Sequence, residues 1–394
     1  MIHQRLRQLR MARGMTLDDL AQATGRVVTR QAISKYEHGQ AQPSPIVLQR
    51  LAQALGVRTT ELLAGHDVQI ELIAYRKRAA LGKRQHEQMA ALAREALRDR
   101  LYLQEIIGEP ARLDAPLFGY PVANLDEAEA AAADLRARWE LGNAPIANLT
   151  DTLEDHGLHV IALDAVDGFD GVAAIARDAD GAALAAAVIG RRSSDGARWR
   201  MNLAHELGHL VLQPQDDFDD EKAAFRFASA LLAPAGDLRS HIGERRNHLH
   251  LEELLLLKRH FGMSMQALLY RMQTLGIINL RLYRSLMIEL SERGWRTAEP
   301  EPLPREEPLW LRRAALRALA EELIDPAEAS RLLGEAIPAP EGAEHAKPER
   351  HCRDLLRQPL ELRHAMLAEQ AAVAADLYAS SANIAHEVAT REHT

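Results

Sequence analysis

Two histidines four residues apart, with a glutamate after the first, are the most constraining feature of this sequence. They stand in the run His205-Glu206-Leu-Gly-His209. Side chains at positions i and i+4 share one face of an α-helix, so a helix here would direct both imidazoles at one point. This arrangement is a known zinc-binding pattern, with the glutamate beside the metal-bound water. We therefore predict a helix on which His205 and His209 bind Zn²⁺ and Glu206 is the catalytic base.

Zinc would lower the pKa of a bound water to about 7, and Glu206 would pass its proton from the attacking water to the leaving amine of a peptide. The pattern is short, however, and occurs by chance on amphipathic helices. The chain has one cysteine, Cys352, which excludes an intramolecular disulfide and a metal site built from several cysteines. Any metal must therefore be held by His, Asp or Glu.

Charge is unevenly distributed along the chain. The 394 residues have a formal net charge of −8, but residues 1–66 hold nine Arg or Lys and four Asp or Glu, a net +5, which leaves −13 on the rest. A basic segment attached to an acidic body is typical of a module that binds a polyanion. We find neither an apolar run of about 18 residues nor an apolar segment behind the basic start, so we expect a cytoplasmic protein with no membrane partner.

Composition and periodicity divide the chain into a mainly helical set of segments. Five short helices are expected in the first 65 residues, and a long charged helix from about Val68 to Gly108. Three β-like runs, 159–165, 171–178 and 183–190, predict a small sheet. Asn202 is the expected N-cap of the histidine helix. The predicted segments are a DNA-binding domain (1–66), a helical linker or dimerisation element (67–115), an α+β zinc domain (116–290) and a helical C-terminal region (291–394) with a Pro-rich linker near 338–349.

The stretch TLDDLAQATGRVVTRQAISKYEHGQ (residues 16–40) resembles the lambda-repressor-like, or XRE, helix-turn-helix family. The resemblance implies a double-stranded DNA operator, bound by a homodimer, with the second helix in the major groove. It places Thr16 at a phosphate and four residues at base edges: Arg30, Gln31, Ala32 and Lys35. Arg and Lys can pair with guanine, Gln with adenine, and Ala can touch a thymine methyl. The turn from Gly25 to Thr29 is about two residues longer than usual for the family, which leaves the register open, and a helical bundle with a solvated basic face is the alternative.

The segment EKAAFRFASALLAP (residues 221–234) resembles the E-x-x-A-x-x-F-A-x-x-L-L-x-P segment of the ImmA/IrrE metallopeptidase family. The resemblance covers about residues 70–320 and implies a zincin-like fold, Glu221 as the third zinc ligand and a repressor protein as peptide substrate. Ala223 stands where members often carry a second acid. Four neighbouring acids remain alternative ligands, although a solvated loop is the simpler interpretation: Asp216, Asp217, Asp219 and Asp220.

Three functions stay open at this point. The first is a DNA-bound regulator whose zinc peptidase cleaves itself or a partner repressor. The second is a ligand-sensing regulator with a non-hydrolytic zinc core, because some XRE proteins with an ImmA/IrrE-like domain respond to acyl-CoA. The third is an antitoxin or phage-type repressor. We expect His248 and His250 on the surface, and no ligand spacing among the histidines not yet named. Tyr270-Arg271 is a candidate oxyanion donor, but an arginine that caps a core helix is the simpler interpretation.

Overall fold

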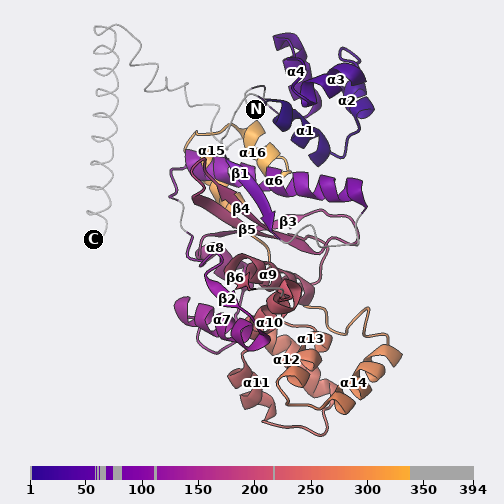
Figure 1. Ribbon diagram of the computed structural model, residues 1–394, viewed down its shortest axis with the longest axis vertical. Coiled ribbons are helices and arrows are strands. Elements are labelled where there is room, and N and C mark those ends of the chain that lie inside the picture. The colour runs from indigo at the N-terminus through magenta and orange to yellow at the C-terminus, as the bar shows by residue number, and fades with distance from the viewer. Residues whose placement is uncertain are drawn as a thin grey trace, which may run out of the picture. The chain divides into compact units, whose positions relative to one another are not determined.

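The computed structural model describes residues 2–57, 59, 62, 68–73, 82–110, 113–215 and 218–337 (Figure 1). The compact unit described below is Met1–Glu335. Cys352 and the predicted Pro-rich linker near 338–349 lie outside the described residues. Within those residues, none of the helices is both long and apolar enough to cross a membrane. The overall composition is mainly helical with a small mixed sheet, as predicted.

The N-terminal helices form a bundle around their own core. They are α1 (Ile2–Ala12), α2 (Leu17–Ala23), α3 (Arg30–Glu37) and α4 (Pro45–Ala54). Leu20, Ile33 and Leu51 are completely buried between them. Side-chain caps define where the helices begin, because Thr16 accepts a hydrogen bond from the Asp19 amide at the start of α2, and Thr29 does the same at α3. Most of residues 58–67, where the fifth helix is expected, lie outside the described residues.

A four-stranded sheet lies at the centre of the following domain. Its strands, in spatial order, are β1 (Gln69–Ile73), β4 (Gly171–Arg177), β5 (Ala183–Arg191) and β3 (Leu158–Leu163). β4 is antiparallel to β1 and β5, whereas β3 is parallel to β5. The three predicted β-runs are thus confirmed as β3, β4 and β5. The helix expected from Val68 onward is wrong for residues 69–73. These residues form β1, which pairs with β4 from Gln69 opposite Arg177 to Ile73 opposite Ala173.

Helix α6 (Lys83–Ile106) covers one face of this sheet. Met89, Ala93 and Leu97 pack on Val172 and Ala174 of β4. Helix α1 packs on α6 as well. No residue of α6 between His86 and Gln104 is exposed, so its apolar face is used within the chain. Pairing of two chains through that face would require the helix to leave the sheet.

The opposite face of the sheet is covered by α9 (Gly196–Val211), as Figure 1 shows. Trp199, Leu203 and Leu207 pack on Ala173 and Ile175, the alternate residues of β4. Helix α9 is longer than predicted. It begins at Gly196, where the Asp195 side chain accepts from two backbone amides, so Asn202 lies inside the helix and is not its N-cap. The Asn202 side-chain amide Nδ2 instead donates to the Asp170 backbone oxygen at 3.1 Å.

Further helices pack beside and below α9. They are α7 (Leu125–Arg138), α8 (Leu149–Asp155), α10 (Asp220–Leu232), α11 (Ala235–Ile242), α12 (Leu251–Phe261), α13 (Met265–Thr274) and α14 (Leu280–Glu292). A short parallel pair, β2 (Tyr120–Val122) and β6 (Leu212–Pro214), follows the end of α9. The described C-terminal helices are α15 (Trp310–Ala320) and α16 (Pro326–Leu333), and α15 packs on α6.

The extended segment before α15 returns to the start of α8 and α9. The Glu306 carboxylate accepts hydrogen bonds from the Leu149 and Thr150 amides at 3.0 and 2.8 Å, which caps α8. The same carboxylate pairs with the buried guanidinium of Arg200 on α9. Residue 306 therefore holds together two helices that precede it by more than a hundred residues.

Candidate metal centre

Helix α9 brings His205 and His209 to one face, as their spacing predicts. Their Nε2 atoms lie 3.1 Å apart, and the rings meet edge to face. Their side chains are 9% and 3% exposed. Both nitrogens therefore point at a common spot that is largely screened from solvent by the surrounding helices.

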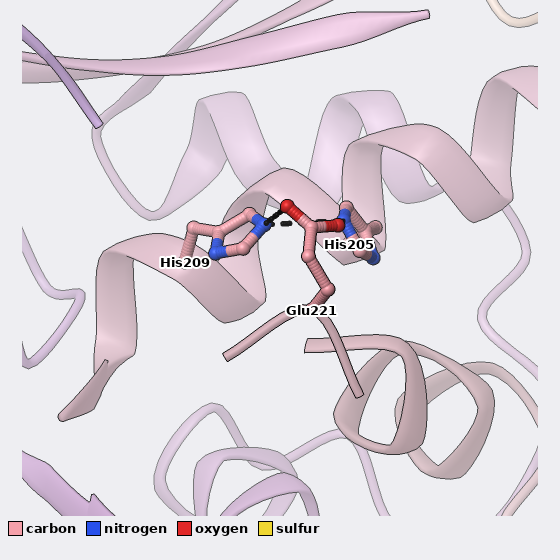
Figure 2. A group of neighbouring side chains, drawn as sticks. All are labelled: His205, His209 and Glu221. Carbon is pink, nitrogen blue, oxygen red and sulfur yellow. Dashed lines mark hydrogen bonds and ion pairs between the residues drawn. The ribbon is translucent and has the colours of Figure 1, made fainter. Parts of the chain in front are cut away.

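Glu221 reaches the same spot from the first turn of α10. Its Oε2 lies 3.2 Å from His205 Nε2 and its Oε1 lies 3.5 Å from His209 Nε2, so the carboxylate bridges the two rings (Figure 2). The pKa of Glu221 is lowered far below its ordinary value, first by the hydrogen bond from His205 and then by that from His209. The carboxylate is thus held in its charged form.

The donor set fits a zinc ion. Ligand bonds of about 2.0–2.2 Å at tetrahedral angles place neighbouring ligand atoms roughly 3.4 Å apart, and the three separations here are 3.1, 3.2 and 3.5 Å. Two imidazoles and a glutamate are also a known ligand set of catalytic zinc. Among the described residues, this trio is one of the groups whose ligand atoms converge within 4.8 Å. The residues present can therefore hold a metal ion.

Glu206 follows His205 on α9, and its side chain packs against the start of β4. Its residue exposure is 1%. A Cβ added to Gly171 of β4 would lie 3.0 Å from Glu206 Oε1 and 2.7 Å from the Ile189 backbone oxygen. Only glycine therefore leaves room for this carboxylate at the start of β4. Gly171 has no predicted role from the sequence, although a glycine at the first position of a strand is a usable signal of close approach.

Two other residues shape the site and were missed. Gly208 allows α10 to approach α9 closely. Phe225, one turn after Glu221, sets its ring edge to face against His205 at 5.5 Å between centroids and is still 47% exposed. An exposed aromatic ring beside the histidines offers an apolar surface at the entrance to the site.

The alternative acidic ligands lie elsewhere or outside the described residues. Asp219 is the N-cap of α10 and accepts from the Lys222 amide at 3.2 Å. Neither Asp219 nor Asp220 belongs to the converging trio, and Asp216 and Asp217 are outside the described part of the chain. Arg271 is completely buried, pairs with Glu129 and donates to the Ala233 backbone oxygen at 3.1 Å. It thus belongs to the core, as the simpler interpretation had it.

Most of the residues predicted to contact DNA lie on α3, with Arg30, Gln31 and Ala32 in its first turn and Lys35 in its last. Arg30, Gln31 and Lys35 are exposed, whereas Ala32 is half-buried. The Arg30 Nη1 atom lies 3.1 Å from Asp18 Oδ2 in an exposed ion pair. Thr16 stands at the start of α2, and its hydroxyl accepts from the Asp19 amide at 3.1 Å. The long turn between α2 and α3 contains Gly25 and Arg26, both with positive φ.

Beneath this surface, a buried ion pair joins α1 to α3. Arg10 Nε and Nη2 donate to the two carboxylate oxygens of Glu37 at 2.6 and 2.7 Å. The side chains are 10% and 4% exposed. A two-bonded pair of this kind fixes the angle between two helices, because neither partner can turn without losing a hydrogen bond. The orientation of α3 therefore depends on α1.

Comparison with known proteins agrees with the geometry. Residues 6–62 match the helix-turn-helix family, and residues 154–273 match the IrrE N-terminal-like domain, a peptidase family. A stretch of 72 residues, 18% of this chain, is 38% identical to an SPbeta prophage-derived uncharacterized HTH-type transcriptional regulator of Bacillus subtilis (strain 168) and covers 65% of it, less than two thirds. A helix-turn-helix domain implies DNA binding. The chain thus carries an N-terminal helix-turn-helix domain followed by an IrrE N-terminal-like domain, and the second of these contains His205, His209 and Glu221.

Proposed function

We propose that this chain is a DNA-binding transcriptional regulator whose IrrE-like domain is a zinc-dependent peptidase that cleaves the chain itself or a partner repressor. One observation carries the catalytic part: Nε2 of His205, Nε2 of His209 and the Glu221 carboxylate converge, with both imidazoles buried. The helix-turn-helix match and the exposed, basic start of α3 support the DNA-binding part.

Each residue has a role in this proposal. His205, His209 and Glu221 hold Zn²⁺, which when bound lowers the pKa of a coordinated water and polarises a peptide carbonyl. The Glu206 carboxylate takes a proton from the attacking water and gives it to the leaving amine. Burial in the space left by Gly171 keeps the Glu206 carboxylate in one position. The Phe225 ring excludes water from one side of His205 and receives an apolar side chain of the substrate.

On DNA, we propose that the chain binds a double-stranded operator as a homodimer. Arg30, Gln31, Ala32 and Lys35 would contact base edges, and Thr16 a phosphate. Arg30, Gln31 and Ala32 belong to the first turn of α3, where this class of domain makes major-groove contacts, and Lys35 lies in the last turn.

Glu206→Gln tests the peptidase. The variant keeps the shape of the side chain but cannot take up a proton, so cleavage should fall by about 10²–10⁴-fold, the usual contribution of a general base. Cleavage of the full chain and of a co-expressed repressor is followed by mass spectrometry, with metal content and operator binding measured on the same samples. The proposal requires metal and DNA binding to persist.

His205→Ala is the matched variant, because it removes a metal ligand and leaves Glu206 in place. It should lose one equivalent of zinc together with cleavage. If His205→Ala abolishes gene regulation in cells while Glu206→Gln regulates normally, the ion has a structural or sensing role and hydrolysis is not the function. Cleavage that survives Glu206→Gln would equally contradict the proposed mechanism.

A further inference from the structure

A second group of metal-ligating side chains lies away from the first. It consists of Asp237 and His241 of α11 and His260 near the end of α12, and one ligand atom of each lies within 4.8 Å of the others. The Asp237 side chain is 16% exposed, and the two histidines are 41% and 37% exposed. The group therefore has a half-buried carboxylate and two imidazoles open to solvent.

Distances within the group suit one bound ion. His260 Nε2 lies 3.5 Å from Asp237 Oδ2, and His241 Nδ1 lies 3.6 Å from Asp237 Oδ1. The first distance is near the roughly 3.4 Å expected between ligand atoms around a tetrahedral zinc ion. The second joins the carboxylate to the His241 ring through the nitrogen that does not bind the ion. The ring centroids of the two histidines are 4.2 Å apart. Each oxygen of one carboxylate thus faces a different imidazole, as in the first site.

One oxygen of the Asp237 carboxylate lacks a hydrogen bond. Asp237 Oδ2 is buried and accepts no hydrogen bond from any described residue. Arg136 is near enough for its charge to act on Asp237, but its donors are taken by backbone oxygens of Gly142, Ala144 and Leu231. A buried carboxylate oxygen without a partner is costly and calls for an explanation. An ion shared with the two histidines supplies one.

His241 is also held in a suitable way. Its Nδ1 lies 2.9 Å from the Asp237 backbone oxygen, one turn earlier on α11. With the proton on Nδ1, that hydrogen bond leaves the lone pair on Nε2 for a metal, and a backbone carbonyl is a usual partner for the second nitrogen of a metal-bound histidine. Two other histidines, His38 and His156, make the same local bond, so this contact alone does not identify a site.

We propose that Asp237, His241 and His260 form a second binding site for a divalent transition-metal ion, distinct from the His205/His209/Glu221 centre. Two imidazoles and one carboxylate suit Zn²⁺ and related ions. Helix α10 separates the sites, because it rises about 16 Å from Glu221 to Leu232 at 1.5 Å per residue. Water completes the coordination, since both imidazoles are accessible.

Such an ion ties α11 to α12. Asp237 and His241 belong to the first helix and His260 to the second, and the intervening residues 243–250 form no helix. An ion bound by both helices restricts their separation. Because the ion binds the folded chain, its binding stabilises the folded state by mass action. The second site thus has a measurable structural effect that does not depend on peptide cleavage.

The experiment uses the full chain, made without a histidine tag and stripped with a chelator. Zn²⁺ is titrated by calorimetry, and Co²⁺ spectra report the ligand set. The background is His205→Ala/His209→Ala, which lacks the first site. It should bind one Zn²⁺, and adding His260→Ala should weaken that binding by more than about 100-fold, since even residues that only orient metal ligands contribute 10–100-fold. His248→Ala is the matched control, because the His248 ring is exposed and lies edge to face against the His250 ring, away from the proposed ligands, and it should leave the affinity unchanged.

Different outcomes separate this site from the first one. A wild-type chain that binds one ion, lost in His205→Ala/His209→Ala, overturns the second site and leaves the proposed peptidase intact. One ion lost in His260→Ala instead supports the second site and contradicts the first. If the double variant does not fold, zinc content of wild type and of Asp237→Asn decides, with two equivalents falling to one in support and equal content against.

Discussion

Gly208 of α9 faces Ala224 of α10 so closely that a Cβ at position 208 would lie 3.0 Å from the Ala224 Cα. The atom in the way is backbone, so relief requires the two helices to separate. Because Glu221 lies one turn before Ala224, separation would carry the carboxylate away from His205 and His209. The glycine within the histidine motif is thus what allows the third ligand to arrive.

Substitution of Gly208 should weaken metal binding. Gly208→Ala gains about 1 kcal/mol of helix propensity but meets overpacking that costs about 1–3 kcal/mol, so zinc affinity falls, and Gly208→Val should lower it further. Gly236→Ala in α11 is the control, since a Cβ there meets nothing within 4 Å. Calorimetric titration of Zn²⁺ measures all three, and equal affinities would show that α10 is not held by this contact.

The buried ion pair of the helix-turn-helix domain should be essential to its stability. Glu37→Gln leaves the Arg10 charge without its partner, which typically costs about 3–5 kcal/mol. Hydrogen exchange of amides in α1 and α3 measures the loss locally, without assuming that the whole chain unfolds in one step. Asp18→Asn removes the exposed pair with Arg30 and should cost less than about 1 kcal/mol. Similar effects of the two substitutions would contradict this assignment.

Stability should depend on pH through Glu154. Burial raises the pKa of this carboxyl from 4.5 to about 7, although the Trp310 and Leu309 amides donate to it and Arg100 and Arg313 are near. Between these values the folded chain keeps a proton that the unfolded chain has released, so stability falls as pH rises from 4.5 to about 7, by roughly 3 kcal/mol in all.

The test of this dependence is Glu154→Gln. Thermal unfolding followed from pH 4.5 to 8 should show a smaller decline in the variant than in the wild type. Glu321→Gln, at the exposed far end of α15, should retain the decline. If Glu154→Gln loses stability with pH as steeply as the wild type, a group other than Glu154 titrates.

Operator selectivity should depend on the first turn of α3. Replacing Arg30 or Gln31 with Ala should lower discrimination between operator and unrelated DNA by about 1–3 kcal/mol for each lost two-bonded base contact. Competition binding at fixed salt measures this. Arg138→Ala, another exposed arginine with one carboxylate partner, lies outside the domain and should have no effect. Unchanged selectivity in the α3 variants would mean that another part of the domain reads the bases.

Local patterns predicted much of the fold. Three apolar runs separated by Asp and Gly became β3, β4 and β5, because alternating faces of a covered sheet require apolar residues on both sides. Thr16 followed by Asp19 is a pattern typical of a helix start, and the structure has both hydrogen bonds of that capping box at the start of α2. The segment QIELI was assigned to a helix, since its partner β4 is about a hundred residues away and charged neighbours on both sides favour a helix locally.

The site was only partly readable. Spacing was enough to place His205 and His209 on one face, but the position of Glu221 depends on the close packing of two helices at Gly208, which no local period encodes. The Asp237 and His241 pair has the same i and i+4 spacing, but its third member, His260, comes from a different helix, so local spacing does not predict the group. In both groups, packing between helices brings the third ligand to the other two, and helix propensity does not predict that packing.

The position of Glu306 has a consequence for how the chain is made. A ribosome releases α8 and α9 well before it reaches residue 306, so until then Arg200 has no carboxylate and the α8 amides have no cap. During that interval the nascent histidine helix is incompletely anchored, and any version of the chain that stops at residue 290 is left permanently in that state. Contacts between residues so far apart in sequence also slow folding. Synthesis past the apparent end of the domain is therefore what completes it.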